Sequence, residues 1–274
     1  MGATVGPSGS AAGASHGFTR SGLPLNRSGI GPYPLVVLQG LLFENKPLRG
    51  VEAWGMLGLY RFLGERFTVY VISRRPGLPV GYAMADMARD YATTIRQEFG
   101  EAVDVIGTST GGSIALHLAA DHPDVVRRLV IHSSAHTLGD AGKRVQLEVG
   151  ALAAEHLWRE AWAALLRFTI PTGALSRPVV WLASHLMAMG APDDPSDLVI
   201  TIEAEDRHAF RERLGEIVAP TLVVGGARDP FYSEKLFRET AEGIPDARLV
   251  VYPRMGHPAG GQRYRREVLA FLAD

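Results

Sequence analysis

The chain has 274 residues, of which 46% are hydrophobic and 21% are charged, and its formal net charge is −1 at pH 7. That composition is ordinary for a globular protein, and the length suits one large domain with room for an insertion. The near-neutral charge argues against nucleic acid or a membrane surface as a partner, and the lack of cysteine excludes disulfides, thiolate metal ligands and a cysteine nucleophile.

We expect the N-terminal residues not to form a signal peptide. Residues 1–31 are rich in Gly, Ser and Ala, with neither the basic start nor the continuous apolar core of a signal peptide. Residues 1–15 consist mostly of such small residues. Such a segment buries too little apolar surface to offset the entropy of ordering, so we expect a flexible tail. Residues 16–27 are expected to form a short hairpin on the edge of a sheet. No run approaches the ~18 apolar residues of a membrane span. The lack of cysteine fits a reducing cytosol, so we expect a cytoplasmic protein.

From residue 34 onward, strand-like and helix-like segments alternate. Short apolar runs predict buried parallel strands, and the amphipathic segments between them predict helices. Strands that return every few dozen residues with helices between them indicate βαβ units and an α/β fold with a parallel sheet. The predicted strands cover residues 35–38, 67–73, 103–107, 127–134, 220–226 and 247–253, and the predicted helices cover 53–65, 84–99, 112–122, 233–243 and 263–273.

The alternation stops between residues 135 and 215. This span contains three of the four tryptophans and several prolines, and it has no segment with a strand pattern. We expect several helices inserted between two strands of the sheet. The predicted organisation is therefore a core of residues 16–134 and 216–274, with a helical insertion at 135–215.

Ser109 lies between a predicted strand and a predicted helix, in the sequence Gly-Thr-Ser-Thr-Gly of residues 107–111. This order is typical of a nucleophile elbow, in which a serine occupies a strained turn. Glycines two residues before and two residues after it relieve crowding, and the helix that follows offers N–H groups to a developing oxyanion. The alternative is a Gly/Ser turn without chemistry, but the strand and helix on either side favour a nucleophile.

A serine nucleophile needs a base and a group that orients the base. Catalytic groups of parallel sheets lie on loops at the carboxyl ends of strands, which restricts the search. Among the nine histidines, His257 follows the last strand, and Asp229 follows the strand at 220–226. Asp140 is the competing acid, because it is the first carboxylate after the strand at 127–134. The chain order Ser109, Asp229, His257 is the one expected for this architecture.

Together, the motifs GTSTGG, GARDPF and MGH resemble those of the α/β-hydrolase fold superfamily, from Leu35 to Asp274. The chain is most similar to serine-nucleophile members of the esterase/lipase-like or haloperoxidase-like kind with a helical cap. The resemblance implies an eight-stranded, mostly parallel sheet, with the insertion at 135–215 as the cap. It also implies an oxyanion hole formed by the backbone N–H groups of Leu41 and Thr110.

Two positions depart from the family pattern. Gln39 stands where His usually precedes the glycine of the oxyanion loop, and we expect its amide to hydrogen-bond the loop as His would. The segment SRRPGLPVG replaces a stretch that commonly carries an acidic residue. Arg74 and Arg75 in that segment are either solvated or close enough to meet an acidic group of a substrate.

The sequence thus predicts a serine hydrolase of carboxylic esters, or of related thioesters or lactones. Acyl transfer or perhydrolysis by the same triad, and a ligand-binding protein that has lost turnover, remain as alternatives. A small apolar substrate fits the aromatic and aliphatic residues near the site, although these could instead attach the cap to the core. No phosphate-loop or metal-ligand spacing occurs, so neither a cofactor nor a metal is expected, and the oligomeric state stays open. The candidate pocket residues are Leu42, Phe43, Trp158, Trp162 and His208.

Overall fold

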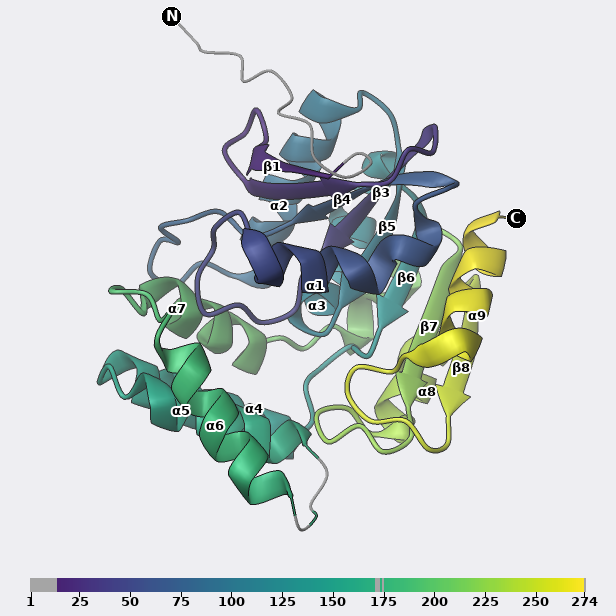
Figure 1. The fold of residues 1–274 in the computed structure, drawn as a ribbon. Coiled ribbons are helices and arrows are strands. Elements are labelled where there is room, and N and C mark those ends of the chain that lie inside the picture. Colours follow the sequence, from purple (N-terminus) through teal and green to yellow (C-terminus); the bar gives the residue numbers. More distant parts are fainter. Residues whose placement is uncertain (1–13, 171–172, 174, 274) are drawn as a thin grey trace, which may run out of the picture.

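A central eight-stranded sheet organises the computed structural model, which describes residues 14–170, 173 and 175–273 (Figure 1). The strand order is β1-β2-β4-β3-β5-β6-β7-β8, and β3 to β8 run parallel. The predicted α/β-hydrolase sheet is confirmed. The strands are β1 (Ser15–Phe18), β2 (Pro24–Ser28), β3 (Tyr33–Leu38), β4 (Phe67–Ile72), β5 (Val103–Thr108), β6 (Val126–His132), β7 (Thr221–Gly226) and β8 (Ala247–Tyr252).

The N-terminal hairpin closes one edge of the sheet. β1 pairs antiparallel with β2, and β2 pairs antiparallel with β4, which confirms the hairpin expected at 16–27. Most of the tail expected at 1–15 lies outside the described residues, although Ser15 is the first residue of β1. The β3–β4 register pairs Leu38 with Ile72. The loops that follow these two strands are therefore neighbours.

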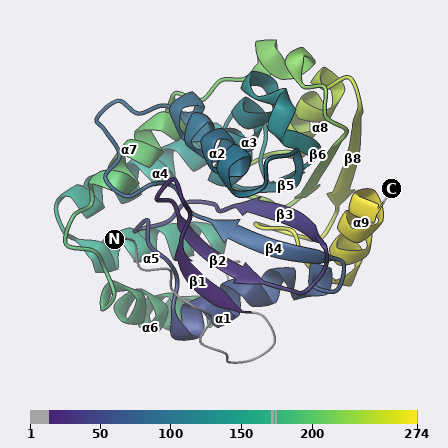
Figure 2. The same ribbon diagram turned by 90° about the horizontal axis from the view of Figure 1, so that it is seen from above.

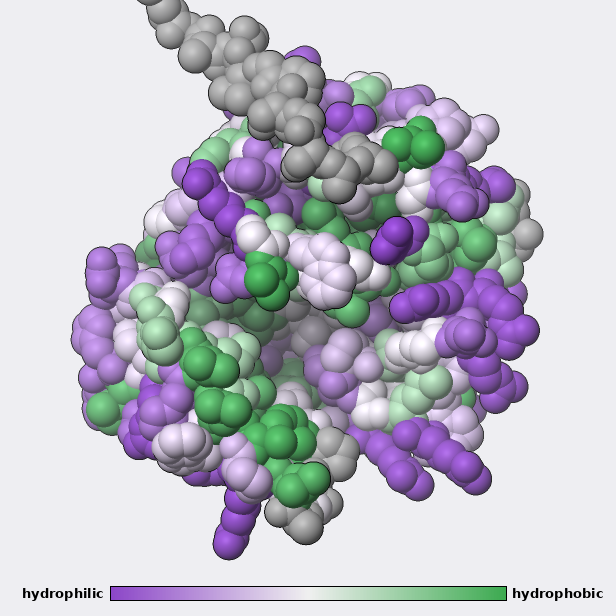
Figure 3. Space-filling view, in the orientation of Figure 1, coloured by the Kyte–Doolittle hydropathy of each residue, from purple (hydrophilic) through white to green (hydrophobic). Residues whose placement is uncertain are grey.

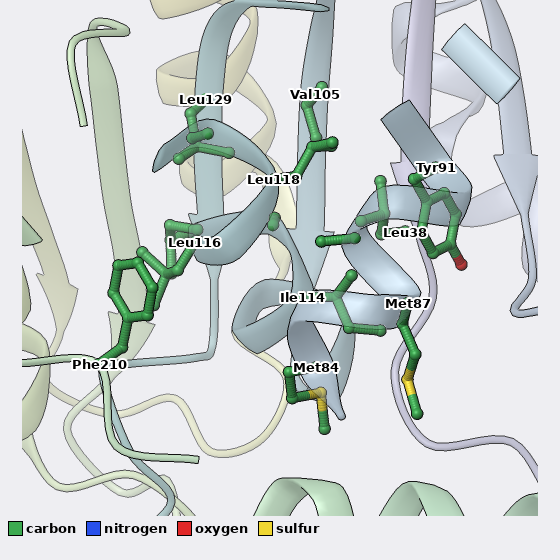
Figure 4. Close-up of a cluster of buried hydrophobic side chains, with 14 of the residues drawn as sticks. Leu38, Met84, Met87, Tyr91, Val105, Ile114, Leu116, Leu118, Leu129 and Phe210 are labelled. Carbon is green, nitrogen blue, oxygen red and sulfur yellow. The ribbon is translucent and has the colours of Figure 1, made fainter. Parts of the chain in front are cut away.

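Helices cover both faces of the sheet, as Figure 2 shows from above. Because side chains alternate along a strand, successive residues of β3 enter opposite cores. Leu38 belongs to the core that also contains residues of α2, α3 and α8, whereas Val37 belongs to the core that contains residues of α1 and α9. Figure 4 shows the first core, where Met87 and Tyr91 of α2 lie near Ile114 of α3. The helices are α1 (Gly50–Tyr60), α2 (Met84–Glu98), α3 (Thr110–Asp121), α8 (Glu234–Gly243) and α9 (Gly261–Ala273).

The chain between β6 and β7 is helical in its described residues, as the sequence predicts for 135–215. It forms α4 (Asp140–Ala154), α5 (Trp158–Thr169), α6 (Ser176–Ala188), α7 (Ser196–Asp206) and a short 3₁₀ helix (Arg211–Glu216). The carboxylate of Asp197 in α7 accepts hydrogen bonds from the N–H groups of Gly77 and Leu78 (3.1 and 2.7 Å), which ties this insertion to the loop after β4. No helix in the described part of the chain is long and apolar enough to cross a membrane.

Candidate active site

Ser109 occupies a sharp turn between β5 and α3. Its backbone has φ 53° and ψ −127°, which is a strained conformation for a residue with a side chain. Its N–H donates to the carbonyl of His132 at 3.0 Å, and its own carbonyl accepts from Gly112 at 2.7 Å. The sequence predicted that this helix begins at Gly112, but α3 begins at Thr110, because Ser109 is the last residue of the turn. The strand, the strained serine and the helix follow each other as expected for a nucleophile elbow.

Close backbone packing explains the glycines around Ser109. A Cβ atom on Gly111 would lie 2.2 Å from the carbonyl oxygen of Leu38, and one on Gly107 would lie 2.6 Å from the Cβ of Ala115. Across the turn, a Cβ on Gly40 would lie 3.2 Å from the Cβ of Ser109. The serine turn is therefore packed directly against the loop that follows β3.

Asp229 and His257 form a hydrogen-bonded pair at the ends of β7 and β8. His257 Nδ1 lies 2.7 Å from Asp229 Oδ2, and the Asp229 side chain is fully buried. Oδ1 of the same carboxylate accepts from the N–H groups of Phe231 (2.9 Å) and Tyr232 (3.1 Å). Since a carboxylate only accepts, Nδ1 carries the proton and Nε2 is left as an acceptor. The competing acid Asp140 is instead exposed at the first residue of α4.

The end of β6 connects the serine turn to the histidine loop. His132 accepts from the Ser109 N–H through its carbonyl, and its Nε2 donates to the carbonyl of Ala259 at 2.7 Å. The next residue, Ser133, accepts from the Ala259 N–H through its hydroxyl at 2.9 Å. His132 and Ser133 thus join the turn of Ser109 to the loop of His257. The His132 side chain is itself buried in this network.

The N–H groups of Leu41 and Thr110, the expected oxyanion donors, lie on the two segments that meet at Ser109. Neither N–H donates to another atom among the residues that the structure describes. Gln39 is buried, and its side-chain oxygen accepts from the Ser73 hydroxyl at 2.8 Å, so its side chain bonds the loop after β4 instead of its own loop. Its amide nitrogen has no hydrogen-bond partner among the described residues. The two N–H groups are available to a bound oxygen atom.

Three of the five candidate pocket residues, Phe43, Trp158 and Trp162, lie together. Phe43 is stacked on Trp162, with ring centroids 3.6 Å apart, and Trp158 is tilted against Phe43 at 6.1 Å. Leu42 precedes Phe43 and is partly exposed. His208 lies apart from this group, because the loop after α7 turns back onto α3, where His208 packs against His117 and Phe210. Figure 3 shows the surface hollowed between α1 and the insertion.

Glu205 of α7 is a buried carboxylate that the sequence analysis missed. Its Oε1 accepts from the Ser113 hydroxyl at 2.6 Å and from the Tyr232 hydroxyl at 3.3 Å. These bonds join the insertion to the first turn of α3 and to the loop of Asp229. Burial raises the pKa of the Glu205 carboxyl, which the hydrogen bond from Ser113 opposes. Helical spacing from Leu198 through Ile202 places Glu205 on the apolar face of α7, and that periodicity was the available signal.

We expect acid to weaken the fold through His132. Burial lowers the pKa of its imidazole from 6.5 to about 4, although the bond to Ala259 acts in the opposite direction. A histidine whose pKa falls on folding gives stability that is present above pH 6.5 and lost as the pH drops toward 4. Urea unfolding at pH 7.5 and pH 5 should therefore show an acid-induced loss that is ~2 kcal/mol smaller in His132→Gln than in the wild type. Equal losses in the two proteins would contradict the shifted pKa.

The arrangement of sheet, serine turn and His–Asp pair is that of the α/β-hydrolase fold. The family model for the alpha/beta hydrolase family matches residues 48–271. The chain belongs to this family, which confirms the resemblance inferred from the three motifs.

Relatives with assigned activities cover most of the chain. One is named "Putative carbamate hydrolase RutD" and comes from Serratia proteamaculans; it is 29% identical over 203 residues, which are 71% of this chain and 76% of that protein. A pimeloyl-acyl-carrier protein methyl ester esterase of Chromobacterium violaceum is 27% identical over 76% of this chain and 85% of its own length. The solved enol-lactonase of Burkholderia xenovorans shares the fold, with a TM-score of 0.75 and 20% identity over 95% of this chain and all of that one (100%).

Proposed function

We propose that this protein is a serine hydrolase that cleaves a carboxylic ester, or a related thioester or lactone, with an apolar acyl or alcohol group. The observation that carries the proposal is the Asp229–His257 pair, whose histidine loop is joined to the strained Ser109 turn by the hydrogen bonds of His132 and Ser133. Membership of the alpha/beta hydrolase family and a relative named as a methyl ester esterase support it.

In the proposed reaction, Ser109 Oγ attacks the carbonyl carbon of the substrate and His257 Nε2 takes its proton. Asp229 holds the Nδ1–H tautomer and stabilises the imidazolium that forms. The tetrahedral oxyanion accepts hydrogen bonds from the N–H groups of Leu41 and Thr110. The protonated histidine then donates to the leaving group, which yields an acyl-enzyme on Ser109. His257 next activates a water molecule, and hydrolysis returns the free serine and the acid.

The proposal is tested by covalent labelling with a fluorophosphonate, which reacts with activated serines. We expect the probe to modify wild-type protein at Ser109, as located by peptide mass spectrometry, and to leave Ser109→Ala unlabelled. A screen of p-nitrophenyl esters of graded acyl length should then show turnover that the label abolishes. A folded wild-type protein that neither takes the label nor cleaves any ester would contradict the proposed function and favour a ligand-binding role.

Replacing the two insertion tryptophans is expected to have different effects, one on stability and the other on substrate preference. Trp162 stacks on Phe43, so Trp162→Ala should mainly lower the free energy of unfolding, by about 3 kcal/mol. Trp158 is partly exposed at the edge of the same group, and Trp158→Ala should change the ratio of rates for short and long acyl esters by about 10-fold or more.

Thermal unfolding and acyl-length profiles of both variants check this division. The matched pair is informative because the residues are one helical turn apart on α5 and contact the same phenyl ring. An acyl-length profile that neither substitution changes would remove both tryptophans from the substrate pocket.

A further inference from the structure

Arg74 is a buried cation beside the loop that carries Leu41. It follows β4 by two positions, it is 1% exposed, and its Nη1 donates to the carbonyl oxygens of Gln39 (3.2 Å) and Gly40 (3.0 Å). The sequence allowed two predictions for Arg74, a solvated side chain or one that meets an acidic group of a substrate. The first prediction is wrong, because Arg74 is buried. Its neighbour Arg75 is exposed and lies 3.8 Å from Asp90.

Arg74 is not half of a conventional buried ion pair. Within the described residues, no carboxylate oxygen lies within 4.0 Å of its guanidinium, and Nε and Nη2 are buried without a hydrogen-bond partner. Removing a guanidinium from water is costly, and here two backbone carbonyls are the only acceptors that the structure gives it. This arrangement indicates that Arg74 serves to hold the Gln39–Gly40 loop, to which those two carbonyls belong.

The carbonyl of Gly40 and the N–H of Leu41 belong to one peptide group. In a trans peptide these two bonds point in opposite directions within one plane, so a bond that fixes the carbonyl also fixes the direction of the N–H. We propose that Arg74 is a positioning residue that aims the Leu41 N–H at the oxyanion formed on the substrate of Ser109. This inference rests on the proposed function.

Ser73 and Arg74 hold the same loop at successive positions. The β3–β4 register pairs Leu38 with Ile72, so the residues directly after β4 meet the residues directly after β3. Ser73 donates to the Gln39 side chain at 2.8 Å, while Arg74 donates to the Gln39 and Gly40 backbone. The Gly40–Leu41 peptide is thereby restrained before a substrate arrives, which is the preorganisation that oxyanion stabilisation requires.

The charge of Arg74 also strengthens the donor. A cation at the carbonyl end of an amide draws electron density toward the oxygen and makes the N–H a better hydrogen-bond donor. Because the guanidinium is buried, water screens this effect little. The benefit falls on the transition state, where the oxygen carries a full charge, more than on the bound ester.

Kinetics of Arg74→Met test this inference, with p-nitrophenyl butyrate as the probe substrate and an alkyl trifluoromethyl ketone as a mimic of the tetrahedral adduct. We expect kcat to fall by about 10²-fold with little change in KM, because losing one oxyanion donor has an effect of that order. The inhibition constant of the ketone should rise by a similar factor. Arg74→Lys should recover part of both losses, because an ammonium can still donate to one carbonyl.

Arg75→Met is the matched control, because it removes a neighbouring arginine that is exposed. It should keep the wild-type kcat and the wild-type affinity for the ketone. A folded Arg74→Met protein with unchanged kcat and ketone affinity would overturn the inference, while Ser109-dependent turnover in the wild type and in Arg75→Met would leave the proposed function standing. If Arg74→Met does not fold, Arg74→Gln decides the matter, because glutamine is polar but uncharged and shorter than arginine. Wild-type kcat and ketone affinity in that variant would equally refute the role.

Discussion

Ser109→Ala is expected to abolish ester hydrolysis while leaving the fold intact. Removal of a serine nucleophile costs about 10⁴–10⁶ in turnover, because the remaining groups bind and polarise the substrate without attacking it. Alanine keeps the Cβ that the turn already accommodates against Gly40, so the packing of the turn is preserved. Steady-state rates on purified protein, together with thermal unfolding, measure the two properties separately.

Ser233→Ala provides the contrasting control. Ser233 caps α8 by accepting from the Leu236 N–H at 3.3 Å, and the loss of such a cap costs ~1 kcal/mol of stability. Ser233→Ala should unfold at a lower temperature and keep its kcat, whereas Ser109→Ala should keep its unfolding temperature and lose its kcat. Activity within tenfold of the wild type in Ser109→Ala would remove Ser109 as the nucleophile.

Asp229→Asn is expected to lower kcat by ~10⁴-fold. Oδ1 of Asp229 accepts from two backbone N–H groups, so the carbonyl oxygen of an asparagine would take that position and direct its NH₂ group at His257 Nδ1. An NH₂ group donates, which forces the His257 proton onto Nε2. The histidine then presents a proton to Ser109 where the reaction needs an acceptor, although the shape of the site is almost unchanged.

Asp140→Asn is the control for this second variant. Asp140 lies exposed at the start of α4, and its replacement should change neither kcat nor the free energy of unfolding by much. A larger loss of activity in Asp140→Asn than in Asp229→Asn would move the acid to the loop after β6.

Local patterns predict the elements that depend on local physics. Continuous apolar runs locate the parallel strands because both faces of those strands are buried, and Ser233 marks the start of α8 because its hydroxyl caps the helix. Glycines around Ser109 predict the turn because any Cβ there would strike neighbouring backbone or side-chain atoms. The catalytic assignment of Ser109, Asp229 and His257 stays a prediction until activity is measured.

The environments of Arg74, Arg75 and His208 depend on tertiary contacts, which the sequence alone does not reveal. Arg74 and Arg75 are adjacent and chemically identical, yet one is buried against the Gln39–Gly40 carbonyls and the other faces solvent. Only the pairing of β3 with β4 separates them, and an isolated sequence does not give that register. His208 likewise looked available to a pocket, but its environment is set by His117, which lies far away in the sequence.

The strand order has a consequence for the newly made protein. β3 to β6 can pair as the chain emerges, which forms the Ser109 turn early, whereas the His257 loop follows β8 at the far edge of the sheet. Synthesis proceeds from the N-terminus, so a nascent chain would carry its serine for some time without a base. It would be inert toward the esters around it until the last strand docks. The time at which the proposed activity first appears during synthesis would then report when β8 pairs with β7 and the sheet is complete.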